Sequence, residues 1–449
     1  MSRTLLRLSI TTLSLAFIVG GTFLAIQFGR GYRLSRDGNL SGTGLLAANS
    51  YPAGALIVID GQAYSKVTDD TINLSPGVYQ IKIEKEGYTS WQKNLSVEAG
   101  VVAQSNAELF RTVPSLAPLS FSGATNINPS PDGQKIAFVN ASPSGTLKAG
   151  LFVLELSDNP LSLSKSPRQV SQNPIGLDFK NASLLWSPDS SQILASFRSA
   201  NYLVDTGTLT KTADLKESSA GLSLLLASWE EELTKRDRQL LLTLPEEMLQ
   251  IATASAKNVY FSPNGEKILY TATSAVTIPD HLTTAPPGSS TQRQERTLKP
   301  GSIYVYDLKE DKNFVIYDHP DELGDDPFTK INLIDNFAAT SGTIASVSAK
   351  SKLQDPSNLQ TTIANFRGQY SPQSFTAYQW FPTSNHILIN RNGSIDIIEY
   401  DGGNLVTLYA GAYEDNFVYP WPNGSKLIIL TNITSGPNLP ANLYAINLK

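Results

Sequence analysis

The chain has 449 residues, a formal net charge of −5, and 17% charged residues. The acidic balance and the scattered Lys and Arg residues provide no basic field, so composition argues against nucleic-acid binding. The chain contains no Cys, which excludes disulfides and thiol chemistry.

The first element is an uncharged run over residues 8–29, bracketed by Arg7 and Arg30. A helix over this run is long enough to cross the hydrocarbon core of a bilayer once. We therefore expect residues 1–36 to form a cytoplasmic tip and a transmembrane anchor that contacts the lipid bilayer through residues 8–29. The alternative is a cleavable signal peptide. Its apolar segment is usually shorter and ends at a small-x-small cleavage site, which residues 23–28 do not offer.

The orientation of this anchor does not follow from its arginines, because nearly equal numbers lie on its two sides: Arg3 and Arg7 before it, and Arg30, Arg33 and Arg36 after it. An N-terminal apolar run normally starts the export of the downstream chain, and long domains cross the membrane largely regardless of charge. We expect a single-pass cell-membrane protein with a cytoplasmic N-terminus and extracytoplasmic C-terminal domains.

A small β-rich region follows a Gly- and Ser-rich spacer. Residues 78–84 alternate between polar and apolar side chains, which is typical of a sheet with one wet face. The strand over residues 56–59 ends in an Asp60-Gly61 turn. These signals predict a small β-sandwich.

The order and spacing of four motifs in this region resemble the PEGA domain family: Tyr51-Pro52-Ala53-Gly54-Ala55, Ile59-Asp60-Gly61, Leu74-Ser75-Pro76-Gly77-Val78-Tyr79, and Lys85-Glu86-Gly87-Tyr88 with Trp91. Ala53 replaces the Glu of the family's Pro-Glu-Gly-Ala turn, a surface position that leaves the fold assignment intact. The resemblance implies a PEGA-like β-sandwich over residues 44–110, common in envelope proteins and without known catalytic residues. We assign Tyr79, Tyr88 and Trp91 to its core.

The rest of the chain repeats one pattern, a Pro-containing turn followed by an apolar strand. The five repeats begin at Ser130-Pro131-Asp132-Gly133, Ser187-Pro188-Asp189-Ser190, Ser262-Pro263-Asn264-Gly265, Phe381-Pro382-Thr383-Ser384 and Trp421-Pro422-Asn423-Gly424. Self-similar units with several strands indicate a propeller or a solenoid.

The Ser-Pro-Asp-Gly turn followed by Lys-Ile-Ala-Phe resembles the WD40-like repeat of periplasmic Tol-type propellers. The resemblance implies a TolB-like β-propeller over residues 116–449. We expect about six blades, and five to seven fit the uneven spacing, with room for a diverged blade between Pro263 and Pro382. The last strand ends at Leu448, and we expect it to close the ring by pairing with a strand near residues 116–120.

Two insertions interrupt the repeats. Residues 216–252 carry apolar side chains at helical spacing, and Pro245 starts a second helix, so we expect a helical hairpin. A cap on the propeller is the favoured role for this hairpin, and a partner-docking helix is the alternative. The insertion over residues 279–300 is rich in Pro, Thr, Ser and Gln, and we expect an exposed mobile loop.

The sequence contains no recognisable catalytic or metal-binding pattern. His281, His319 and His386 lack metal-ligand spacing, and no Gly-x-Ser-x-Gly motif occurs. The acidic residues between 318 and 326 lack the alternation of a calcium loop. We therefore assign no catalytic, cofactor-binding or metal-binding residues, and we expect neither enzymatic activity nor a cofactor.

These inferences predict a membrane-anchored extracytoplasmic binding or scaffold protein of the cell envelope, whose propeller recognises a protein partner. A glycan-binding cell-wall or surface-layer anchor is the alternative. A hydrolase that acts in the propeller channel is the least favoured hypothesis. The identity of the envelope protein or glycan stays open at this point.

Overall fold

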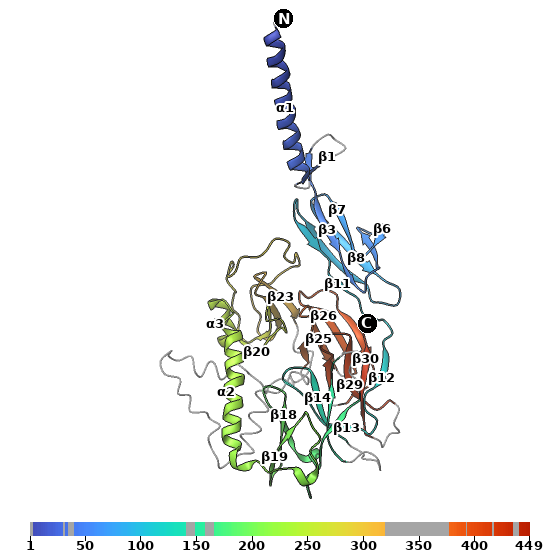
Figure 1. The fold of residues 1–449 in the computed structure, drawn as a ribbon, viewed down its shortest axis with the longest axis vertical. Coiled ribbons are helices and arrows are strands. Elements are labelled where there is room, and N and C mark those ends of the chain that lie inside the picture. The colour runs from blue at the N-terminus through green and yellow to red at the C-terminus, as the bar shows by residue number, and fades with distance from the viewer. Residues whose placement is uncertain are drawn as a thin grey trace. The chain divides into compact units, whose positions relative to one another are not determined.

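The computed structural model describes residues 3–29, 32–34, 40–140, 149–157, 166–318, 377–391, 393–414, 417–433 and 440–449. The chain forms two compact units (Figure 1). The first consists of residues 1–110 and 285–292, and the second of residues 111–284 and 293–449. His319 and the acidic residues 319–326 lie outside the described residues.

The first unit begins with helix α1 (Arg3–Gly29). A two-stranded ribbon of β1 (Tyr32–Leu34) and β2 (Leu40–Gly42) follows it. Among the residues that the structure describes, no helix combines the length and the hydropathy of a membrane span.

The body of the first unit contains three sheets. Their strands are β10 (Val102–Gln104), β3 (Gly44–Ala48) and β7 (Asp70–Leu74) in one sheet, β6 (Gln62–Val67), β5 (Leu56–Ile59), β8 (Gly77–Glu84) and β9 (Trp91–Val97) in the second, and β11 (Ala107–Glu108) with β4 (Ser50–Tyr51) in the third. In these sheets, β10 pairs parallel with β3, β11 pairs parallel with β4, and the other neighbours pair antiparallel. Side chains such as Leu46, Ile57, Ile81 and Trp91 form one buried core, against which Tyr79 and Tyr88 pack. The alternation predicted for residues 78–84 therefore arises because one face of β8 covers this core.

The second unit contains five antiparallel sheets within the described residues, named I to V in chain order. Their strands, in order across each sheet, are β13 (Ala124–Pro129), β14 (Lys135–Asn140), β15 (Gly150–Glu155) and β16 (Arg168–Gln172) in sheet I; β17 (Ser183–Trp186), β18 (Gln192–Ser196) and β19 (Asn201–Asp205) in sheet II; β20 (Ala256–Phe261), β21 (Lys267–Ala272), β22 (Ile303–Asp307) and β23 (Lys312–Tyr317) in sheet III; β24 (Tyr378–Trp380), β25 (His386–Arg391), β26 (Ser394–Glu399) and β27 (Val406–Ala410) in sheet IV; and β28 (Val418–Pro420), β29 (Lys426–Thr431), β30 (Asn442–Asn447) and β12 (Ser115–Pro118) in sheet V.

Neighbouring sheets share buried cores. Sheet I packs against sheet V on one side and sheet II on the other. Sheets III and IV also pack directly against each other, and the Trp380 indole donates to the Tyr260 carbonyl at 2.9 Å. Within the described residues, no further sheet stands between III and IV, where the sequence left room for a diverged blade between Pro263 and Pro382.

Sheet V joins the two ends of the second unit. Its outer strand β12 pairs antiparallel with β30, so that Leu116 lies opposite Ile446. The Leu119 amide continues the ladder to the Leu443 carbonyl at 2.7 Å. This is the pairing that the sequence predicted between residues 116–120 and the last strand.

Two helices follow sheet II in the chain, α2 (Leu222–Leu241) and α3 (Glu246–Ala254). The helix α2 buries Leu222, Leu226 and Trp229 against Leu185 and Leu194 of sheet II. The helix α3 buries Met248 and Ile251 against sheet III. The helical pair thus packs on both sheets.

The base of the insertion over residues 279–300 packs on sheet III. Leu298 is buried in the core of that sheet, and its amide donates to the Val276 carbonyl at 2.8 Å. The Arg296 guanidinium forms ion pairs with Asp280 at 2.8 Å and Asp311 at 3.0 Å. The two arms of the insertion are therefore held by specific contacts.

Candidate binding face

The five repeated turns have the same backbone hydrogen bonds. In each, the amide of the fourth residue donates to the carbonyl of the first, at 2.7 to 3.0 Å. The first residue's amide also donates to the carbonyl of the residue that begins the second strand, as Ser130 does to Lys135 at 2.9 Å. The turn end of each sheet is the end where this turn joins its first and second strands.

Side chains of the turn satisfy one another. The Ser187 hydroxyl donates to Asp189 Oδ1 at 2.5 Å, and the Ser191 amide donates to the same oxygen at 3.1 Å. These hydroxyl and amide donors stabilise the ionised carboxyl and hold the pKa of Asp189 below its usual range, with the Ser187 hydroxyl as the largest cause. Ser130 and Asp132 form the equivalent bond in sheet I. The polar atoms of the turns are therefore used to build the turns.

The fourth turn residue has a left-handed backbone in all five repeats. Gly133, Gly265 and Gly424 have φ near +70°, and Ser190 and Ser384 have φ of 57° and 60°. A Ser in this conformation is strained, whereas a Gly is not. The two serines therefore need a compensating interaction.

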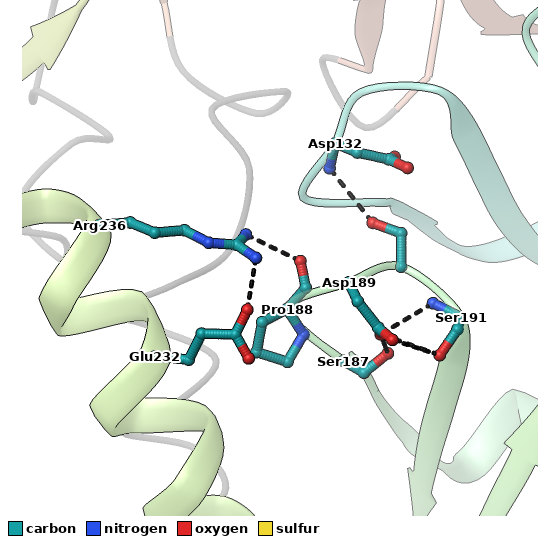
Figure 2. A network of polar contacts seen from close by, with 8 residues as sticks. Asp132, Ser187, Pro188, Asp189, Ser191, Glu232 and Arg236 are labelled. Carbon is teal, nitrogen blue, oxygen red and sulfur yellow. Dashed lines mark hydrogen bonds and ion pairs between the residues drawn. The ribbon is translucent and has the colours of Figure 1, made fainter.

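Hydrogen bonds between neighbouring turns provide that interaction. The Asp132 amide of sheet I donates to the Ser190 hydroxyl of sheet II at 3.2 Å (Figure 2). In the same way, the Asn264 amide of sheet III donates to the Ser384 hydroxyl of sheet IV at 3.1 Å. Both serines are fully buried. The turn ends of these sheets consequently lie side by side.

The helix α2 connects the turns of sheets II and III. Arg236 donates to the Pro188 carbonyl at 2.9 Å and pairs with Glu232 one helical turn earlier (Figure 2). Four residues after Arg236, the Leu240 side chain lies 3.8 Å from the position of a Cβ at Gly265. The helix therefore contacts one turn from each of the two sheets.

Asp237 places a carboxyl on the apolar stripe of α2. It follows Leu226, Trp229 and Leu233 at helical spacing and is half-buried. Burial raises the pKa of Asp237 to about 6, and the neighbouring Arg236 opposes this shift. The ionised form of Asp237 thus destabilises the folded chain at neutral pH.

The histidines do not form a catalytic or metal-binding cluster in the described part of the chain. His386 Nε2 is buried 3.9 Å from the Glu399 carboxylate, at the position where Lys267 pairs with Asp307 in sheet III. His281 lies in the 279–300 insertion. Within the ranges that the structure describes, no three His, Cys, Asp or Glu side chains are grouped as metal ligands.

The opposite end of the sheets, which we call the loop end, carries exposed apolar side chains. The antiparallel order places the connections β12–β13, β16–β17 and β29–β30 at this end. They carry Phe121, Ile175 and Ile433, whose exposures are 78%, 88% and 53%. No sequence pattern distinguishes these residues, because a single apolar residue in a polar connection does not recur from repeat to repeat.

Residues 43–112 match the PEGA domain family. The predicted PEGA assignment is confirmed over this range, which agrees with the body of the first unit. The match ends at residue 112, at the start of the second unit, and it does not cover the five sheets of that unit. A comparison with curated proteins finds no match.

The solved structures that are similar to this chain include TolB proteins. TolB from Acinetobacter baumannii is 12% identical, with a TM-score of 0.22, and the match covers 90% of this chain and 63% of that chain. A putative TolB from Agrobacterium tumefaciens is 12% identical, with a TM-score of 0.18, and the match covers 88% of this chain and 99% of that one. Because these TM-scores are low, we describe the architecture of the second unit from its own sheets and turns alone.

Replacing Ser190 tests the link between the turns. We expect Ser190→Ala to lower the free energy of unfolding by about 1 kcal/mol, because the Asp132 amide loses its hydrogen-bond acceptor. Ser190→Gly loses the same bond but relieves the left-handed strain, which offsets about 1 kcal/mol of the loss. Urea unfolding followed by tryptophan fluorescence measures both, with Ser228→Ala on the exposed side of α2 as control. Equal stability of the alanine and glycine variants would contradict the assigned strain.

Replacing Asp237 tests its raised pKa. The folded chain holds this proton more tightly than the unfolded chain, whose pKa is near the ordinary 3.8, so stability falls as the pH rises from about 4 to about 6. Asp237→Asn removes this penalty and should stabilise the fold by on the order of 2 kcal/mol at pH 7.5, with no gain near pH 4. Unfolding measured at pH 4, 5.5 and 7.5 checks this, with the exposed Glu231→Gln as control. A gain in the free energy of unfolding that does not depend on pH would contradict the raised pKa of Asp237.

Proposed function

We propose that this chain is a membrane-anchored extracytoplasmic binding protein of the cell envelope, without enzymatic activity, whose second unit binds a protein partner at its loop end. The observation that carries the proposal is the exposure of Phe121, Ile175 and Ile433, at 78%, 88% and 53%, in the connections at the loop end. At the turn end, polar side chains of the repeated turns bond within and between the turns. Leu405 is also exposed at the turn end, at 52%, and serves below as a control position.

The packing of the sheets supports a rigid binding scaffold. Shared cores join sheets V, I and II, and also sheets III and IV. The Gln379 side chain donates to the Val418 carbonyl at 3.0 Å and links sheet IV to sheet V. With α2 between the turns of sheets II and III, these contacts support a closed propeller-like ring. Loops on such a rigid ring are common recognition surfaces.

Exposed apolar residues at the loop end favour a protein partner. Phe, Ile and other large apolar side chains contribute most of their binding energy when a partner removes them from water. Phe121 and Ile175 lie in connections that are not needed for the repeated turns, so they are free to serve recognition.

The first unit supports the proposed anchoring. Residues 8–29 carry no charge. The helix α1 exposes apolar side chains around its surface, among them Leu13, Phe17 and Val19, and Phe17 is 82% exposed. Transfer of these side chains into hydrocarbon is favourable, whereas their exposure to water is costly. The PEGA domain then follows the anchor as a spacer with its own core.

Charges placed in α1 test the anchor. We expect the wild-type chain to stay in the membrane pellet after an alkaline wash, and Phe17→Lys/Val19→Asp to be released, because each charge at the centre of a span costs about 3 kcal/mol. The same charge types on the exposed strand β6, in Gln62→Lys/Ser65→Asp, form the control. Release of the wild-type chain would contradict the anchor, and a mature N-terminus beyond residue 29 would support the cleaved signal peptide.

The orientation is open to a direct labelling test, because the chain contains no Cys. A membrane-impermeant maleimide should label Ser65→Cys in intact cells, and should label Ser2→Cys only after lysis. The reverse pattern would place the second unit in the cytoplasm.

Substitutions at the loop end test partner binding. The detergent-solubilised full chain is used to capture material from envelope extract. We expect Phe121→Ser/Ile175→Ser to weaken capture of a specific protein by about tenfold or more. The control, Leu242→Ser/Leu405→Ser, changes two residues of 63% and 52% exposure outside the loop end, and should bind as the wild type does. Capture of carbohydrate alone would favour the glycan-binding anchor, and equal capture by both variants would overturn the loop-end site.

A further inference from the structure

A short segment from the 279–300 insertion belongs to the first compact unit. The chain leaves the second unit after Thr284, contributes residues 285–292 to the first unit, and returns at Arg293. Within the first unit, the Thr291 hydroxyl donates to the Asn94 carbonyl at 3.0 Å, and the Gln292 side-chain amide donates to the same oxygen at 2.9 Å. One backbone acceptor of β9 therefore receives two side-chain donors from this segment.

The accepting carbonyl lies on the outer edge of a sheet. The strand β9 is the last strand in the order β6-β5-β8-β9. Asn94 lies opposite Gln80 of β8, and the backbone amide and carbonyl of Gln80 bond to Asp60, on the other side of β8. Residues that face each other in this way direct their backbone groups away from each other, so the Asn94 carbonyl points outward. An uncovered edge of this kind pairs readily with other chains.

The backbone of the segment also approaches the neighbouring strand β10 closely. Gly288 has φ of +79°, and a Cβ there would lie 3.0 Å from the Val102 carbonyl oxygen. Only glycine combines that backbone conformation with such a close approach. The contact therefore depends on a particular residue of the segment as well as on its two side-chain donors.

The composition of the segment suits a cover rather than a further strand. Its sequence is Ala-Pro-Pro-Gly-Ser-Ser-Thr-Gln, without charge. Pro286 and Pro287 have no amide hydrogen to add to a ladder. The Ser289 hydroxyl bonds to the Pro286 carbonyl at 2.6 Å and closes a turn within the segment. The segment thus uses side chains to satisfy the edge and presents few backbone donors of its own.

We propose that the outer edge of β9, together with the adjoining backbone of β10, is a docking edge for an uncharged segment rich in Pro, Ser and Thr. Residues 285–292 are its resident occupant in the same chain. By covering the Asn94 carbonyl, they close the edge of the PEGA domain to strand pairing with a second copy of the chain. This role is independent of partner binding at the loop end.

Hydrogen exchange of the full-length chain tests the proposal. In Thr291→Ala/Gln292→Ala, amides in β9 and β10 should exchange about tenfold faster than in the wild type, the effect of losing one or two hydrogen bonds. The matched control, Gln294→Ala/Thr297→Ala, removes the same side-chain types just outside the segment and should exchange as the wild type does. Exchange in β29 reports on the fold of the second unit.

A second variant and a peptide make the outcome decisive. Gly288→Ala keeps both side-chain donors but blocks the approach to Val102, and it should give the same faster exchange in β9 and β10. A peptide with the sequence of residues 285–292, added in excess to the double variant, should restore slow exchange, whereas the peptide with Ala for Thr and Gln should not. Unchanged exchange in both variants, or acceleration that includes β29, would overturn the proposal.

Discussion

The second unit depends on one local constraint, the tight turn that joins the first two strands of each sheet. A left-handed fourth residue and hydrogen bonds within the turn fix the direction in which the second strand leaves. Where the fourth residue is Ser, its hydroxyl accepts the backbone amide of the preceding turn, so local geometry and the packing of neighbours are coupled. In these two repeats, the same four residues define one sheet and link it to the neighbouring sheet.

This constraint separates structural from variable positions. Polar side chains of the turns bond within and between the turns, and α2 adds the bond from Arg236 to Pro188. The described connections at the opposite end differ in length, from residues 119–123 between β12 and β13 to residues 173–182 between β16 and β17. A scaffold of this kind permits changes at one end without loss of the fold, which is the usual basis of recognition by loops.

The sequence predicted those features that depend on neighbouring residues in the chain or on a repeated motif. The Pro-containing turns, the alternation in β8, the PEGA motifs and the apolar stripe of α2 each depend on residues close together in the chain. It did not predict contacts between residues that lie far apart in the chain. No sequence pattern marks the residues that form the bond from Arg236 to Pro188 or the two bonds to the Asn94 carbonyl. The burial of Asp237 likewise depends on the packing of α2 and not on its neighbours in the chain. Phe121 and Ile175 were missed because exposure is a property of the folded chain.

The pairing of β12 with β30 also bears on how the chain is made. Ser115 and Asn447 bond to each other across 332 positions of sequence, so sheet V has strands from both ends of the second unit. During synthesis, β12 emerges early and lacks its partner until the C-terminus has emerged. Contacts of such long sequence separation form late and slow the final step of folding. A chain truncated before Asn442 would leave a hydrogen-bonding edge open, a signal by which quality-control proteases can distinguish unfinished from finished molecules.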